Sequence, residues 1–128
     1  MANPNIVEVS SIYANNNFIS AGLGDSSETY QLLINNPAGS GKVFKVNSIS
    51  VANTTSGNVV FTSIKIFSED DLVGDSVHIV NEIPVPYQTT LIVTDKETTF
   101  YLLENQSVGV YADEADGVAV TTSWEEIS

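Results

Sequence analysis

Two neighbouring stretches decide the fold predicted from this sequence: GSGKVFKVNSISVAN at residues 39–53 and NVVFTSIKIF at residues 58–67. β-Branched and aromatic residues alternate with small polar residues along both stretches, which is the period-two pattern of β-strands. The residues that separate them are Thr, Ser and Gly, which favour turns. We therefore predict one long β-hairpin, in which Asn53 and Asn58 face each other across the turn.

Both faces of this predicted hairpin carry apolar side chains. One face gathers Val43, Ile49, Val51, Val60, Ile64 and Ile66, and the other gathers Phe44, Val46, Phe61 and Phe67. A hairpin with one face in water alternates more cleanly than this. The second face is therefore expected to contact another layer, a loop or another subunit, so that Phe44, Val46, Phe61 and Phe67 are candidate interface residues.

The length and the cysteine count limit the domain organisation. At 128 residues the chain is expected to form a single domain, residues 1–128, that buries roughly two-thirds of its unfolded surface. Cysteine is absent, which excludes disulfides and thiolate metal sites. No apolar run approaches the roughly 20 residues of a membrane span, and the first residues lack the pattern of a signal peptide. We expect a soluble protein with no membrane partner.

Acidity is the most unusual bulk property of the chain. Sixteen acidic residues stand against four lysines, and the formal net charge is −12. A nucleic-acid surface needs clustered basic residues, whereas the lysines at 42, 45, 65 and 96 are scattered. The composition therefore argues against nucleic acid. It remains compatible with solubility at high salt, with docking on a basic surface, or with cation binding.

The rest of the chain consists of short strand-like segments separated by turn residues. Residues 1–6 are expected to form an extended arm before a first strand, which Asn15-Asn16-Asn17 would break. Segment 68–75 is predicted to be an exposed loop, and Pro84 and Pro86 indicate an edge strand or a connection. Val118, Val120, Thr122 and Trp124 share one face of the last strand. About nine or ten strands without helical periodicity predict an all-β, single-domain antiparallel β-sandwich of jelly-roll type.

Few residues have the types and spacing that catalysis requires. His78 is the sole histidine, and it alternates with Val77 and Ile79, which predicts a solvent-facing or interface position. Gly39-Ser40-Gly41 lacks the spacing and the strand-to-helix context of a nucleophile elbow. The following Lys42 does not complete a phosphate-binding loop, because Val43 stands where Ser or Thr is required. We predict no catalytic residues and therefore no enzyme.

Two acidic clusters are the candidate cation ligands. Glu69-Asp70-Asp71 with Asp75, and Asp113-Glu114 with Asp116, offer the carboxylate oxygens that hard cations prefer. Neither cluster has the spacing of the twelve-residue calcium loop. The simpler interpretation is that these acids keep surface loops solvated, so we predict no metal site and no cofactor.

Five stretches of this sequence suggest a family. They are Met1-Ala2-Asn3-Pro4-Asn5-Ile6-Val7, residues 41–49, Ile83-Pro84-Val85-Pro86 with Leu91-Ile92-Val93, Tyr101-Leu102-Leu103-Glu104, and residues 123–128. Together they resemble the small virion structural proteins of marine tailed phages, particularly cyanophages, and the similarity covers nearly the whole chain.

The resemblance implies a virion structural protein, assembled in the host cytoplasm and located on the capsid surface as a decoration or cement protein. The expected partners are other copies of the chain, as a homotrimer, and the major capsid protein or other virion proteins. On this hypothesis Ile6 in the amino-terminal arm reaches a neighbour. Alternatives remain open: a tail, neck or fibre-associated protein, a carbohydrate-binding module, and a hydrolase whose cleft would hold a perturbed carboxylate.

Overall fold

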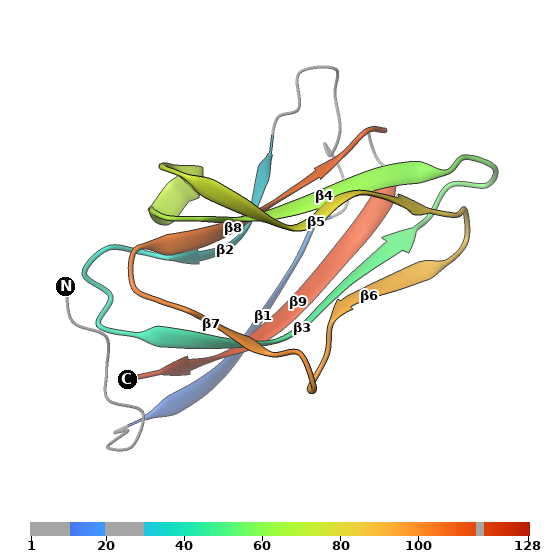
Figure 1. The fold of residues 1–128 in the computed structure, drawn as a ribbon. Helices are drawn as coiled ribbons and strands as arrows, with labels where there is room; N and C mark the ends of the chain where they lie inside the picture. Colours follow the sequence, from blue (N-terminus) through green and yellow to red (C-terminus); the bar gives the residue numbers. More distant parts are fainter. Residues whose placement is uncertain (1–10, 20–29, 115–116) are drawn as a thin grey trace.

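Nine β-strands provide nearly all the regular structure in the computed structural model, which describes residues 11–19, 30–114 and 117–128. A single 3-10 turn, η1 at Asp70–Leu72, lies among them in the described part of the chain (Figure 1). The strands are β1 (Ile12–Ile19), β2 (Gln31–Asn36), β3 (Val43–Asn53), β4 (Val60–Phe67), β5 (Ser76–Val85), β6 (Thr90–Thr94), β7 (Phe100–Leu102), β8 (Gln106–Ala112) and β9 (Val118–Ile127).

The strands form two antiparallel sheets that pack face to face. The five-stranded sheet has the order β1-β9-β3-β6, and β7 pairs with β3 beside β6; the four-stranded sheet has the order β2-β8-β4-β5. In Figure 1 the four-stranded sheet lies above the five-stranded one, and the chain alternates between them from β1 to β4 and from β7 to β9. This strand order is that of a jelly roll. The predicted all-β sandwich is confirmed.

The predicted hairpin is wrong, because β3 and β4 belong to different sheets. β3 lies between β9 and the β6/β7 pair, whereas β4 lies between β8 and β5. The turn itself lies where the sequence indicated: the side-chain Nδ2 of Asn53 donates to the carbonyls of Asn58 (2.8 Å) and Val85 (2.7 Å). These bonds hold a connection that crosses the sandwich. Alternation reports which side chains are buried, and it leaves open which strand is the neighbour.

A β-bulge explains why the sequence of β3 suggests two apolar faces. Val46 pairs with Trp124, but the next pair is Ser48 with Ser123, so Asn47 is the extra residue. A bulge reverses the direction of every side chain that follows it. Phe44 and Val46 before the bulge, and Ile49 and Val51 after it, therefore all point into the core. These four residues therefore do not form the two opposite apolar faces that the sequence predicted.

The asparagine-rich segment continues β1 where the sequence predicted a break. Residues 12 to 19 pair without interruption with residues 127 to 120 of β9. Asn17 donates from its side chain to the carbonyl of Leu33 (2.9 Å), and Asn15 donates to the carboxylate of Glu126 (3.0 Å). The long-range ladder therefore overrides a local turn preference.

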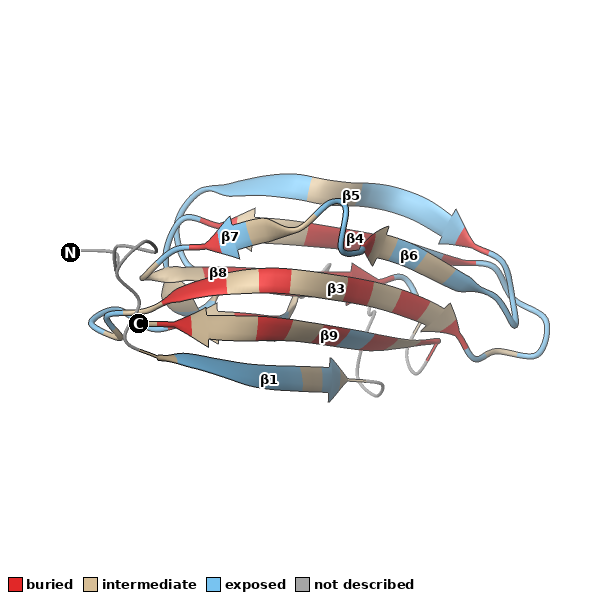
Figure 2. Ribbon diagram, turned by 90° about the horizontal axis from the view of Figure 1, so that it is seen from below, coloured by how far each residue is buried: buried red, intermediate tan, exposed pale blue. Residues whose placement is uncertain are grey.

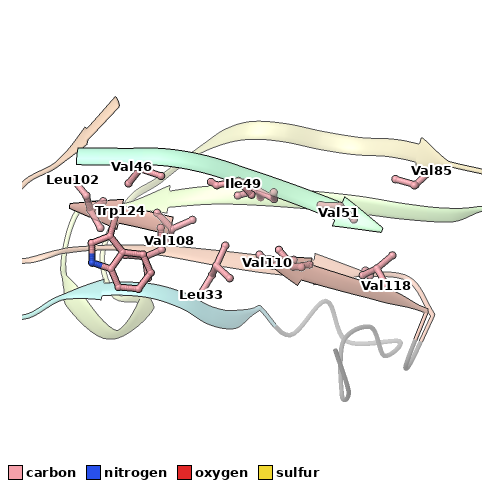
Figure 3. Close-up of a cluster of buried hydrophobic side chains, with 14 of the residues drawn as sticks. Leu33, Val46, Ile49, Val51, Val85, Leu102, Val108, Val110, Val118 and Trp124 are labelled. Atoms are coloured by element: carbon pink, nitrogen blue, oxygen red, sulfur yellow. The ribbon is translucent and has the colours of Figure 1, made fainter. Parts of the chain in front are cut away.

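The core lies between the sheets and draws on both. Figure 3 shows Leu33, Val108 and Val110 of the four-stranded sheet facing Val46, Ile49 and Trp124 of the five-stranded sheet. The Trp124 ring stacks on Phe44, with ring centroids 5.8 Å apart. The predicted shared face of the last strand is confirmed, and it points inward, because Val118, Val120, Thr122 and Trp124 are all buried.

A second, smaller aromatic cluster covers the outer face of the four-stranded sheet. The Tyr30 ring packs against Phe67 (6.1 Å between centroids) and Tyr111 (5.7 Å), and Lys65 Nζ lies 4.7 Å from the centre of the Tyr30 ring. Gly109 lies beneath them, where an added Cβ would come within 3.1 Å of Phe67. This cluster buries Phe67 within the chain's own structure.

Candidate interaction surface

Most of the residues predicted to form an interface are not on the surface. Phe44 and Val46 are 4% and 0% exposed in the core, because the bulge in β3 turns them inward. Phe67 is buried in the outer aromatic cluster, whereas Phe61 is 43% exposed. Ile6 and the predicted arm at 1–6 lie outside the described residues. Most of the exposed apolar surface of the described chain therefore lies on other residues.

Three of the four edges of the sandwich carry features that oppose pairing with another strand. β5 contains Pro84, which lacks an amide hydrogen, a positive φ of 48° at Glu82, and two register shifts against β4. β2 has a register shift between Leu32 and Ile34. The fourth strand position of the five-stranded sheet is split into β6 and β7 by the turn at Asp95. Such devices are common on edge strands that must stay unpaired.

β1 is different, because it is a regular and exposed edge. It contains no proline, no charged residue and no bulge over its eight residues. Ile12 is 55% exposed and Phe18 is 72% exposed. Figure 2 shows β1 as the outermost strand beside β9, with most of its length exposed. A long, neutral, apolar-flanked edge is a template for adding a strand.

The hydrogen-bond pattern shows which backbone groups of β1 face outward. Ser11 and Ser128 exchange both of their backbone hydrogen bonds, at 3.1 and 3.0 Å. Hydrogen-bonded pairs alternate with non-hydrogen-bonded pairs along an antiparallel ladder, so the odd-numbered residues of β1, like Ser11, form backbone hydrogen bonds with β9. The amides and carbonyls of Ile12, Ala14, Asn16 and Phe18 therefore point to the open edge. Within the described ranges, no strand pairs with that edge.

The outer face of the five-stranded sheet carries small polar side chains at its centre. Ser48 bonds Ser123 (2.8 Å) and Ser50 bonds Thr121 (3.0 Å) through their hydroxyls. The register places Phe18 at one end of the row through Thr121 and Ser50, and Ile92 at the other end. Larger apolar side chains thus stand on both margins of a face of small hydroxyl residues.

A partly buried ion pair lies beside β1. Glu126 accepts hydrogen bonds from Lys42 (3.0 Å), Asn15 (3.0 Å) and the Trp124 indole (3.1 Å). Partial burial by itself raises the pKa of Glu126, but these hydrogen bonds and the charge of Lys42 outweigh it, and the pKa lies below its usual value. Each carboxylate oxygen has a partner, so this group acts as a structural anchor for β1, β3 and β9.

The residues considered for nucleophilic catalysis occupy separate structural positions. His78 is exposed on β5, opposite Lys65 of β4. The Ser40 hydroxyl donates to Asn36 Oδ1 (2.6 Å) in the turn between β2 and β3. Ser40 therefore serves the turn before β3.

The acidic loops use their carboxylates as hydrogen-bond acceptors within the chain. Asp70 accepts from the amide of Ala38 (2.9 Å), Asp71 accepts from the side chain of Asn35 (3.1 Å), and Asp113 accepts from the amide of Phe61 (2.9 Å). Asp116 lies outside the described residues. In the described part of the chain, no group of three His, Asp or Glu side chains is placed to hold a metal ion.

A shallow hollow of about 280 Å³ lies at the end of the sandwich near η1. Its lining is mostly apolar and includes Ile66, Phe67 and Val77, with Asp75 as its carboxylate. A glycoside hydrolase of the usual kind requires a pair of carboxylates. The described lining does not supply such a pair. Across the described residues, no helix is long and apolar enough to cross a membrane.

The comparisons with known proteins identify no family for this chain. No protein-family model matches the chain, and no curated protein matches it. A solved structure of the Gt strain of infectious bursal disease virus contains a chain that is similar over 94% of this chain, with a TM-score of 0.45 and 8% sequence identity. This chain spans 33% of the length of that viral chain.

Sequence reasoning missed β1 as the candidate site, although a signal was present. The run Ile12–Ile19 contains no charged residue, although the chain has a net charge of −12. The apolar residues Ile12, Phe18 and Ile19 lie at or near its ends. Reading the three asparagines as a turn concealed this pattern. Only the pairing with β9 showed that the run is one continuous strand.

Proposed function

We propose that this chain is a non-enzymatic structural protein of a virus particle, and that it acts as a capsid decoration, or cement, protein on the outer surface of a tailed-phage head. The observation that carries the proposal is the β1 edge, an exposed and uncharged strand on an otherwise acidic sandwich. Such an edge provides attachment through backbone hydrogen bonds, which requires no active site. The resemblance of the sequence to small phage virion proteins supports the same role.

Several polar side chains are occupied by hydrogen bonds within the chain, which is consistent with attachment as the function. The carboxylates of Asp70, Asp113 and Glu126 accept hydrogen bonds from the chain's own groups. They therefore stabilise loops and strand ends. The partners that fit are other copies of this chain and the major capsid protein or another virion protein. Many copies of a modest contact would add through multivalency.

Electron cryomicroscopy of particles from the virus that encodes the chain would test this proposal. We expect density for the sandwich at many equivalent positions on the outside of the head. Heads that lack the protein should open at a lower temperature than complete heads, and adding the purified chain should restore the difference. Density at the tail, neck or fibres would instead support the alternative structural role, and absence from purified particles would refute both.

A glycan array provides the control for the carbohydrate-binding alternative. We expect no binding to immobilised glycans, with or without calcium, because the aromatic rings of the outer cluster pack against one another and Phe67 and Tyr111 are buried. Specific binding that is lost when the exposed Tyr87 or Tyr101 is changed to Ala would favour a carbohydrate-binding module.

A further inference from the structure

We propose that β1 pairs with β1 of a second copy of this chain, antiparallel and about a two-fold axis at Asn15, so that the two five-stranded sheets become one continuous sheet. This inference does not depend on a role in a virion, since it concerns the free edge of the sandwich alone. It predicts a dimer in place of the trimer expected from the sequence.

The direction of the side chains limits the possible registers. Ile12, Ala14, Asn16 and Phe18 pair with Ile127, Glu125, Ser123 and Thr121, on the outer face of the sheet, and their amides and carbonyls point to the open edge. A two-fold axis perpendicular to the sheet keeps the outer faces of both copies on the same side. Even-numbered residues must then face even-numbered residues, which also satisfies the hydrogen-bonding requirement.

One register fits this rule and uses the whole strand. With the axis at Asn15, Ile12 faces Phe18 of the second copy and Ala14 faces Asn16, each twice by symmetry. The two most exposed apolar side chains on the outer face of β1 thereby become cross-strand partners. With the axis at Asn16, Phe18 would face Ala14, and Ile12 would have no partner among the described residues.

The lack of charge on β1 permits a second copy at this edge. Two chains of net charge −12 repel each other, so self-association requires a contact strip that adds no further like charge. β1 contains no acidic and no basic residue over its length. Added salt screens the repulsion of the remaining surface, and dimerisation should therefore strengthen between low and moderate ionic strength.

The open edge is ready for pairing with one local change. The amide of Asn16 donates to Oδ1 of its neighbour Asn15 at 2.8 Å. Pairing would replace this bond with one to Ala14 of the second copy. Among the described residues, no hydrogen bond occupies the outward backbone groups of Ile12, Ala14 and Phe18.

Sedimentation velocity of the full chain, with a set of charge variants, tests the register. We expect a concentration-dependent mass of twice 13.7 kDa for the parent. Ile12→Glu and Phe18→Lys should each weaken dimerisation by about tenfold, because a charge would face an apolar side chain. The double variant should recover most of the loss, because the introduced glutamate and lysine face each other twice. Ile92→Glu, on the opposite margin of the same sheet, is the matched control and should leave the dimer unchanged.

A cross-link keeps the test decisive if a charge variant fails to fold. The chain has no cysteine, so Asn15→Cys introduces a single thiol per copy. On the two-fold axis this position forms a non-hydrogen-bonded pair, with Cα atoms about 4.5 Å apart, which is within the range for a disulfide. We expect rapid dimer formation under mild oxidation, and none for Ile92→Cys.

Several results would overturn the proposal. They are a parent that stays monomeric up to about millimolar concentration, a trimeric mass, or a dimer that is insensitive to the β1 variants and is not cross-linked through position 15. A monomer that instead gains a strand from another virion protein at this edge would also overturn it.

Discussion

The ammonium of Lys42 lies 3.0 Å from Oε1 of Glu126, and this ion pair joins the residue before β3 to the end of β9. Glu126 Oε2 accepts from Asn15 of β1 and from the indole of Trp124. One carboxylate therefore links three adjacent strands at the edge of the core. Its ionisation should be measurable in both stability and fluorescence.

The first prediction concerns pH. The pKa of Glu126 in the folded chain lies below its ordinary value of 4.5, so the ionised form stabilises the fold above that value. This contribution should disappear as the pH falls through the folded-state pKa. Glu126→Gln should lower the free energy of unfolding by about 1 kcal/mol at pH 7, and the gap to the parent should close in acid. Denaturant unfolding at several pH values measures the gap.

The sole tryptophan gives an independent readout of the same group. Trp124 donates to Glu126, so its emission should change with a midpoint below 4.5 in the parent. Glu126→Gln should remove that step. A step that persists in the variant would assign the titration to another carboxyl group.

The second prediction compares two buried threonines. Thr62 has a buried hydroxyl with no hydrogen-bond partner in the described structure, whereas the Thr122 hydroxyl donates to the carbonyl of Ser48 at 2.8 Å. Thr62→Val should leave the stability unchanged or raise it by up to about 1 kcal/mol, because it removes an unsatisfied polar atom. Thr122→Val should cost about 1 kcal/mol. Thermal and denaturant unfolding would show whether the two variants move in opposite directions.

The third prediction separates core from surface among the phenylalanines predicted to form an interface. Phe44→Ala should lower the free energy of unfolding by about 3–5 kcal/mol, because Phe44 is buried and stacks on Trp124. Phe61→Ala should change it by less than about 1 kcal/mol, since Phe61 is 43% exposed. Equal effects in equilibrium unfolding would contradict the inward direction assigned to Phe44 before the bulge.

The fourth prediction concerns the close approach at Gly109. A Cβ there would lie 2.8 Å from Leu72 and 3.1 Å from Phe67, so Gly109→Ala should cost about 1–3 kcal/mol and loosen the outer aromatic cluster. Gly57 has nothing within 4 Å of its added Cβ, and Gly57→Ala is the control, expected to be near neutral. Near-ultraviolet circular dichroism would report the packing of Tyr30, Phe67 and Tyr111. An unchanged spectrum with unchanged stability would show that the cluster is not tightly packed.

The sequence by itself determined the fold class, because alternation and turn residues are local properties. It grouped Val118, Val120, Thr122 and Trp124 on one face of β9, located the exposed loop at 68–75, and indicated an edge or a connection near Pro84. These features depend on the order of apolar and polar residues within a few positions. They hold whichever strands become neighbours.

Only the tertiary structure decided the partners of the strands, and with them the candidate site. β3 and β4 separate into different sheets, the bulge at Asn47 turns Phe44 and Val46 inward, and β1 runs through three asparagines because β9 pairs with it from more than a hundred residues away. Pairing is a long-range property, set by which hydrogen-bonding edges and apolar faces meet when the whole chain packs. A pattern with a period of two residues carries no information about that choice.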